Sequence, residues 1–306
     1  SPRAADLLLD AGGRAVDLPA HARDAHVVRI LVIDGEVGPV LLTQAGVQAY
    51  LLASGLGSGP HRVEVYRRTE ASFGASTFHG FDFGPNGSLL APRLPSRTIE
   101  FIGDSITCGY GNEGENATCG FSADTENHYL TYAAIAAREL DADAVTIAWS
   151  GKGVVYNYDT DTNDPLPVLY DRVVPTESGS VWDFSVQPDV VVINLGTNDF
   201  STDGDPTQEL FAGRYLELLE HLREVYPDAF ILCTVGPLLG GADLDAARAG
   251  IAEAVMTRNA AGDAKVEHWE MNIPNDSPGC DYHPSVATHR LMADALVDEL
   301  TSRLGL

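Results

Sequence analysis

The sequence predicts two domains: a small all-β domain, followed by a larger α/β domain built on a parallel sheet. Three observations support this division. Before about residue 97, short β-rich runs are separated by clusters of Gly, Pro and Ser. After it, apolar runs of strand length alternate with amphipathic stretches of helix length. Between them, Pro92, Pro95 and Ser96 form a predicted linker. We therefore place the domains at residues 1–95 and 96–306.

The first domain is predicted from short strands. Val63 and Val65 alternate with Glu64 and Tyr66, as expected of a half-buried strand. Regular turn signals without helical periodicity favour a small β-sandwich. The predicted strands are Val27–Ile33, Val40–Leu42, Tyr50–Leu52, Arg62–Arg67 and Thr77–Phe83.

The second domain is predicted from strand–helix alternation, which implies a parallel sheet covered by helices on both faces. Active sites in such sheets form beyond the carboxyl ends of the strands, so the residues that follow strands are the ones to inspect. The predicted strands are Arg97–Ile102, Ala144–Trp149, Asp189–Leu195, Phe230–Val235 and Val266–Met271. The predicted helices are Tyr129–Leu140, Glu209–Tyr226, Leu244–Asn259 and Val286–Leu304.

Composition excludes several classes of partner. The chain has a net charge of −25 and only two lysines, which disfavours binding to nucleic acid or to anionic membrane surfaces. No apolar run approaches the roughly 18 residues that a membrane-spanning helix needs. We expect a monomer without metal ion or cofactor. The acidity itself is typical of a solubility adaptation and does not identify a substrate.

Four groups of residues lie where the sheet rule places chemistry. Ser105 follows the predicted strand that ends at Ile102, and Gly103 permits a tight turn between them. Gly151 follows the next strand and can offer an unshielded backbone N–H. Asn198 follows the third strand, and its amide can face developing negative charge. Taken singly, each of these groups equally fits an ordinary turn or helix cap.

The fourth group is Asp281-Tyr282-His283-Pro284, just before the last predicted helix. Histidine is the usual proton acceptor for a serine nucleophile, because its pKa lies near neutrality. The alternative is that His283 merely precedes a helix whose first turn Pro284 suits. The combination of Ser, Gly, Asn and His at successive strand ends is far more specific than any one of them.

With these four residues the chain resembles the SGNH (GDSL) hydrolase superfamily, whose name lists them. The resemblance covers about residues 97–306. It implies a flavodoxin-like three-layer α/β/α domain, a serine carboxylic ester hydrolase, and an oxyanion hole formed by Ser105, Gly151 and Asn198.

A narrower resemblance is to carbohydrate esterase family 2. It rests on Phe101–Gly111, on Ser150–Gly153 and on Gly279–Pro284. It implies an N-terminal jelly-roll domain and removal of O-acetyl groups from plant polysaccharides such as xylan or glucomannan, as an acetyl xylan esterase does. The alternatives are a general short-chain esterase or lipase, and a carbohydrate-binding protein whose hydrolase site is relict.

The orienter of His283 is left open by the sequence. The superfamily usually carries Asp three residues before the histidine, and Cys280 occupies that position here. Either the Asp281 carboxylate, two residues before His283, completes a triad, or a backbone carbonyl orients a Ser–His dyad.

The four cysteines predict two disulfides in a secreted or cell-surface protein, the alternative being buried thiols in a cytoplasmic enzyme. We expect a Cys108–Cys119 bridge that closes the loop after the nucleophile, and a Cys233–Cys280 bridge that holds the loop of His283 to the sheet. Two aromatic residues, Trp182 and Tyr282, are predicted to contact the sugar.

Overall fold

The computed structural model describes residues 7–9, 16–21, 28–84 and 87–306. They divide into two compact units, one ending at Leu94 and the other running from Pro95 to Leu306. Val27, the first residue of the first predicted strand, lies outside the described residues.

The first unit consists of antiparallel strands in two sheets. The five-stranded sheet has the order β4-β3-β6-β1-β8 and the three-stranded sheet the order β5-β2-β7. Every strand pair among the described residues of this unit is antiparallel. The strands are β1 (Leu7–Leu9), β2 (Val16–His21), β3 (Val28–Ile33), β4 (Glu36–Leu42), β5 (Gly46–Tyr50), β6 (His61–Arg67), β7 (Ala75–Ser76) and β8 (Leu89–Leu90).

Several strands of this unit differ from the prediction. Asp34 and Gly35 both have positive φ, of 53° and 87°, which makes the tight hairpin turn between β3 and β4. The predicted strand Val40–Leu42 is therefore only the end of a longer β4. The predicted strand Thr77–Phe83 is wrong, since this segment has no regular strand. The sequence did not predict β1, β7 and β8, because a strand of two or three residues shows no periodicity.

The second unit is built on one parallel sheet with the strand order β10-β9-β11-β12-β13. This confirms the parallel sheet predicted from the sequence. Its strands are β9 (Arg97–Gly103), β10 (Ala142–Ala148), β11 (Val190–Asn194), β12 (Phe230–Thr234) and β13 (Val266–His268). Its helices are α1 (Ser105–Cys108), α2 (Tyr132–Glu139), α3 (Leu166–Leu169), α4 (Gln208–Val225), α5 (Gly241–Ala260) and α6 (Val286–Leu304).

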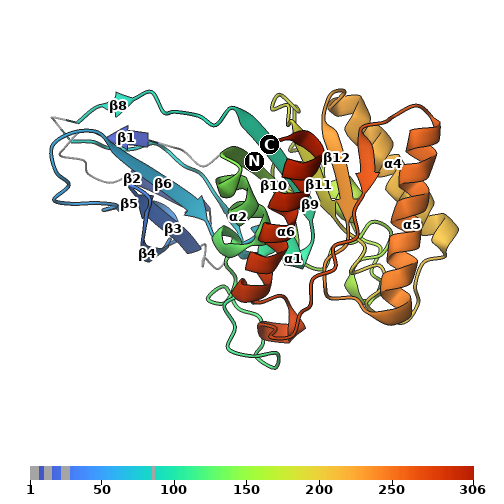
Figure 1. Cartoon of the computed structure of the whole chain (residues 1–306). Coiled ribbons are helices and arrows are strands. Elements are labelled where there is room, and N and C mark those ends of the chain that lie inside the picture. Colours follow the sequence, from blue (N-terminus) through green and yellow to red (C-terminus); the bar gives the residue numbers. More distant parts are fainter. Residues whose placement is uncertain (1–6, 10–15, 22–27, 85–86) are drawn as a thin grey trace. The chain divides into compact units, whose positions relative to one another are not determined.

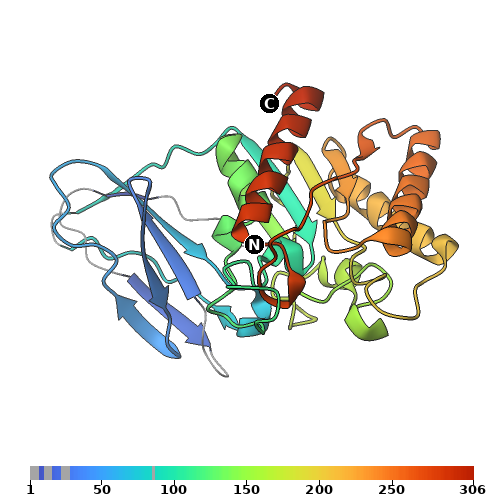
Figure 2. The same cartoon turned by 60° about the horizontal axis from the view of Figure 1, so that its bottom comes forward.

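Helices cover the sheet on both faces (Figures 1 and 2). Side chains of α4 and α5 pack with β11 and β12 in one buried cluster, and side chains of α2 and α6 pack in a second. The chain runs from β9 outward to β10 and then returns to the other side of β9 to form β11. A doubly wound sheet has its ligand crevice at the carboxyl ends of the strands where the order reverses, here β9 and β11.

A buried carboxyl group lies in the middle of β9. Glu100 is 1% exposed, and its two oxygens accept hydrogen bonds from the hydroxyls of Tyr170 (2.5 Å) and Tyr226 (2.8 Å). Burial raises the pKa of Glu100 to about 7, although the two hydroxyls favour the charged form. The pKa of this carboxyl in the unfolded chain is 4.5. Its contribution to the free energy of unfolding is therefore largest below pH 4.5 and is lost as the pH rises through about 7.

We therefore expect Glu100→Gln to be more stable than the wild type at alkaline pH, because the amide removes the buried charge and can still bond both hydroxyls. The difference in free energy of unfolding should grow by on the order of 3 kcal/mol between mildly acidic and alkaline pH. Urea unfolding at several pH values measures it. The exposed residue Glu224 supplies the control, Glu224→Gln. A difference that does not change with pH would contradict the prediction.

Candidate active site

Three strand ends meet at one edge of the sheet. Gly103 at the end of β9 pairs with Ala148 of β10 and with Asn194 of β11. Ser105, Gly151 and Asn198 follow these strands in the sequence. The segments that contain them therefore leave the sheet at the same edge. The structure thus places three of the four predicted groups at the crevice that the strand order defines.

Ser105 is the first residue of α1, directly after a sharp turn out of β9. A Cβ at Gly103 would lie 2.0 Å from Oγ1 of Thr107, so only glycine fits there. The side chain of Asp104 accepts a hydrogen bond from the backbone N–H of Ile106 (3.0 Å) and caps the helix. The backbone N–H of a first helical residue has no acceptor within its helix, so that of Ser105 is available to an anion.

His283 reaches Ser105 from the other end of the chain. Its Nε2 lies 2.8 Å from Oγ of Ser105, and its Nδ1 lies 3.0 Å from the backbone oxygen of Asp281. A carbonyl oxygen only accepts, so the proton is on Nδ1 and Nε2 has the lone pair. In this tautomer the imidazole accepts the proton of the serine hydroxyl. The pair has the geometry of a nucleophile and its general base.

The structure decides between the two orienters of His283. The backbone carbonyl of Asp281 faces the imidazole, whereas its carboxylate accepts a hydrogen bond from the hydroxyl of Tyr110 (2.8 Å). The prediction that the Asp281 carboxylate is a catalytic triad acid is therefore wrong. The reason is spacing: only one residue separates Asp281 from His283, and at φ 49° and ψ 40° its main chain turns the carbonyl back toward the ring.

Because the carboxylate does not touch the imidazole, Asp281→Asn should lower kcat by less than about tenfold. The equivalent change of a true triad acid costs about 10⁴-fold. Asparagine also tolerates the left-handed backbone found here and keeps an oxygen for Tyr110. Steady-state hydrolysis of an acetyl ester measures the effect, and a loss of a thousandfold or more would restore the triad.

Burial lowers the pKa of His283 from 6.5 to about 4. A general base works in its neutral form, so activity should persist as the pH falls below 6.5 and be lost only near pH 4. The acid limb of kcat/KM against pH tests this, and a midpoint at or above 6.5 would contradict it.

A control must separate titration of His283 from acid unfolding. Burial also lowers the pKa of His289 to about 3, so protonation of that ring destabilises the fold in acid. Samples returned to neutral pH must therefore recover full activity, which shows that the acid limb does not come from unfolding.

Two further residues of the predicted oxyanion hole, Gly151 and Asn198, lie in the segments after β10 and β11. Gly151 has φ +79°, a conformation that side chains disfavour, and the loop after β10 turns there. Nδ2 of Asn198 donates to the backbone oxygen of Lys152 (2.9 Å), which uses one of its two N–H groups. The prediction assigns its other N–H to the developing oxyanion. The contact also ties the segment after β11 to the loop that contains Gly151.

Asp199 is a site residue that the sequence analysis did not single out. Its buried carboxylate accepts hydrogen bonds from the backbone N–H groups of Val154 (2.9 Å), Val155 (2.7 Å) and Tyr156 (2.9 Å). Burial nevertheless raises its pKa to about 6. The residue anchors the loop after Gly151 against the segment of Asn198. The sequence feature that could have identified Asp199 is its position directly after Asn198.

Of the two aromatic residues predicted to contact the sugar, Trp182 is buried and Tyr282 is exposed. Trp182 is only 8% exposed and packs edge-on against Phe184, so the structure contradicts the prediction that its ring meets a sugar. An aromatic residue in a long loop was the only signal, and such residues more often pack inward. Tyr282 is 63% exposed beside His283. Tyr158, 59% exposed, donates its backbone N–H to the oxygen of Gly151 (2.8 Å).

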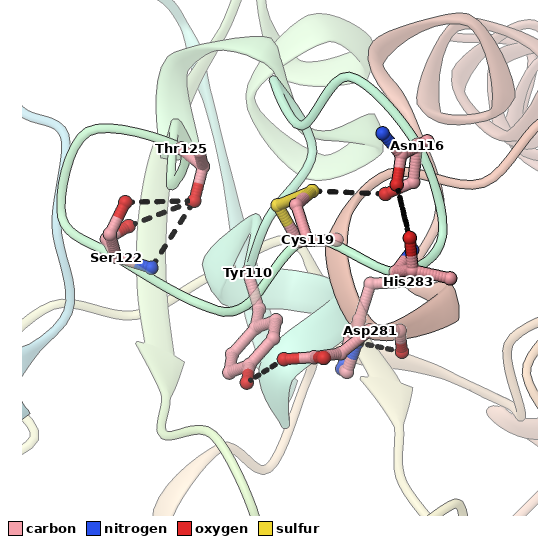
Figure 3. The surroundings of a disulfide bond; sticks show 9 residues. Tyr110, Asn116, Cys119, Ser122, Thr125, Asp281 and His283 are labelled. Atoms are coloured by element: carbon pink, nitrogen blue, oxygen red, sulfur yellow. Dashed lines mark hydrogen bonds between the residues drawn. A yellow bond between two sulfur atoms is a disulfide. The ribbon is translucent and has the colours of Figure 1, made fainter.

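The cysteines pair differently from the prediction. A disulfide joins Cys119 to Cys280, whereas Cys108 and Cys233 are buried outside it. The predicted pairs Cys108–Cys119 and Cys233–Cys280 are therefore wrong. Cys108 lies inside α1 and Cys233 inside β12, and both side chains point into the core. Figure 3 shows Cys119 near Asp281 and His283.

The fold and the site define a class of protein, a serine hydrolase of the SGNH type. Residues 101–291 match the GDSL-like Lipase/Acylhydrolase family, and residues 11–92 match the Carbohydrate esterase 2 N-terminal family. In the part of the chain that the structure describes, no helix is both long and apolar enough to cross a membrane.

Proteins of similar sequence indicate a narrower family within this class of hydrolases. The chain is 47% identical over 280 residues to the cellulase/esterase CelE of Acetivibrio thermocellus, covering 90% of this chain but only 34% of CelE. It thus spans about a third of that protein's length. It is 31% identical over 300 residues to an acetylxylan esterase / glucomannan deacetylase of Cellvibrio japonicus, covering 92% of this chain and 80% of that protein.

A solved structure agrees with these relatives. A family two carbohydrate esterase from Clostridium thermocellum, in complex with cellohexaose, has a TM-score of 0.91 and 42% identity, covering 98% of this chain and 92% of that one. The chain belongs to carbohydrate esterase family 2, which confirms the resemblance seen in the sequence.

Proposed function

We propose that the protein is a serine esterase that removes O-acetyl groups from plant polysaccharides or oligosaccharides such as xylan and glucomannan. The observation that carries the proposal is the 2.8 Å contact between Oγ of Ser105 and Nε2 of His283 at the crevice of the sheet. The substrate class follows from the related esterases, two of which are named acetylxylan esterase / glucomannan deacetylase.

In the first half of the reaction, Oγ of Ser105 attacks the acetyl carbonyl carbon while Nε2 of His283 takes its proton. The carbonyl oxygen becomes an oxyanion, which the N–H groups of Ser105, Gly151 and Asn198 stabilise. The intermediate collapses as the bond to the sugar oxygen breaks. The imidazolium returns its proton to that oxygen, which leaves a free sugar hydroxyl and an acetyl-serine.

In the second half, a water molecule attacks the acetyl-serine and His283 accepts one of its protons. The same oxyanion hole receives the second tetrahedral intermediate. Its collapse releases acetate and returns the proton to Oγ of Ser105. The carbonyl of Asp281 accepts the Nδ1–H bond throughout and stabilises the transient imidazolium by its dipole.

Product analysis of defined acetylated oligosaccharides tests the proposal. Wild-type protein should release acetate from xylo- and glucomanno-oligosaccharides, leaving the sugar chain length unchanged in the mass spectrum. A series of esters from acetyl to octanoyl distinguishes the two esterase alternatives. Preference for long acyl chains would favour a general lipase, and binding without any release of acetate would favour a carbohydrate-binding protein.

The proposal extends to the setting of the enzyme. We propose that it acts outside the cell, because a disulfide is typical of oxidising compartments. We also propose that it is a monomer, in which one chain supplies every catalytic group. The antiparallel sheets of the first unit support a jelly-roll domain. We propose that the exposed rings of Tyr282 and Tyr158 face the sugar.

A further inference from the structure

The Ser–His dyad depends on one unusual stretch of backbone. Among the described residues, Nδ1 of His283 has one hydrogen-bond partner, the backbone oxygen of Asp281 at 3.0 Å. That carbonyl points toward the ring because Asp281 and Tyr282 both adopt the left-handed conformation, with φ values of 49° and 62°. Two consecutive non-glycine residues in this region cost free energy, so other contacts must hold them.

Several of those contacts come from residues 109–121, which we call the clamp loop, and Nδ2 of Asn275 also donates to the backbone oxygen of Tyr282 (2.8 Å). The backbone N–H of Cys280 donates to the oxygen of Gly111 (3.0 Å), and that of Asp281 donates to the oxygen of Cys119 (3.1 Å). The Cys119–Cys280 disulfide adds a covalent link immediately before Asp281.

Close packing leaves little freedom between the two segments. A Cβ at Gly111 would lie 2.8 Å from Cβ of Cys280, and one at Gly114 would lie 2.4 Å from its sulfur. Cys280 itself is fully buried. The clamp loop therefore fixes the residue just before Asp281 in place.

Tyr110, also in the clamp loop, contacts the other side of the same structure. Its hydroxyl donates to Oδ2 of Asp281 (2.8 Å), as Figure 3 shows. Its ring stacks on the imidazole of His283, with 4.1 Å between centroids, and is backed by the ring of Phe121 at 3.8 Å. The side chain of Tyr110 thus contacts both Asp281, whose carbonyl orients the imidazole, and the imidazole of His283 itself.

We propose that Tyr110 and the Cys119–Cys280 disulfide are positioning residues for His283. They hold the Asp281 carbonyl on Nδ1 and so take the place of the carboxylate that orients the base in a triad. The sequence is consistent with this role: Cys280 occupies the position of the missing aspartate, so that position now supplies a covalent link in place of a negative charge.

The first test removes the disulfide in the double variant Cys119→Ala/Cys280→Ala, assayed on 4-nitrophenyl acetate well below its melting temperature. We expect kcat to fall at least tenfold with KM little changed, and the acid limb of the pH profile to move up toward 6.5 as the ring becomes solvated. Dithiothreitol, which reduces the bridge to two thiols and leaves as its cyclic disulfide, should do the same to the wild type. The double variant is the matched control and should not respond to it.

The second test is independent of the cysteines. Tyr110→Phe keeps the stacked ring and removes the hydroxyl, so we expect a loss of about threefold to tenfold in kcat. Tyr110→Leu also removes the stack and should lose more. If the hydroxyl acts through Asp281, then Tyr110→Phe combined with Asp281→Ala should be no slower than Asp281→Ala alone.

The inference rests on the proposed esterase activity, and the assay separates the two. A wild type that does not hydrolyse the aryl ester would count against the proposed function. An active wild type, with variants of lower melting temperature but unchanged kcat and pH profile, would overturn the inference alone, because the clamp loop would then only stabilise the fold.

Discussion

Replacing Ser105 by alanine should lower kcat for acetyl ester hydrolysis by about 10⁴-fold or more, because no acetyl-enzyme can form. Oγ of Ser105 is the hydroxyl oxygen that Nε2 of His283 contacts, at 2.8 Å, so its removal leaves the base without its nucleophile. Single-turnover assays with the pure variant measure the loss. Ser302→Ala, an exposed serine on α6, is the matched control and should retain full activity.

His283→Ala should lose about as much, and the double variant with Ser105→Ala should be little worse than either single variant. The two side chains act as one unit, so their effects are not additive. Mass spectrometry adds a direct check, since an acetyl group should accumulate on the wild type but not on Ser105→Ala. Hydrolysis by Ser105→Ala at a rate within tenfold of the wild type would overturn the mechanism.

The second large effect is expected at the oxyanion hole. Asn198→Ala removes the one side-chain donor of the site and should lower kcat by about 10²–10³-fold. Because the bound ester has no oxyanion, and negative charge develops on the oxygen only as the reaction proceeds, KM should change little. The variant also loses the bond to the backbone oxygen of Lys152, so a crystal structure should be used to verify the loop of Gly151.

A matched control for this variant is Asn259→Ala, at the exposed end of α5. It should leave kcat unchanged. A loss at Asn198→Ala that appears mainly in KM would instead place the amide in contact with the ground-state substrate, and would contradict its assignment to the oxyanion hole.

The sequence by itself determined the architecture of the second unit and the identity of the reacting pair. Strand–helix alternation is a strong local signal, because buried parallel strands are continuous apolar runs and the covering helices are amphipathic. Ser105, Gly151 and Asn198 could be found because each follows a predicted strand. The short strands of the first unit were less predictable, since β1, β7 and β8 have only two or three residues each.

Only the tertiary structure decided how the base is held. Which group faces Nδ1 of His283 depends on two left-handed residues, Asp281 and Tyr282, and no sequence pattern specifies that conformation for non-glycine residues. The pairing of Cys119 with Cys280 likewise depends on which loops meet in space across 161 residues of chain. Local propensity fixes elements, whereas the contacts between loops follow from how those elements pack.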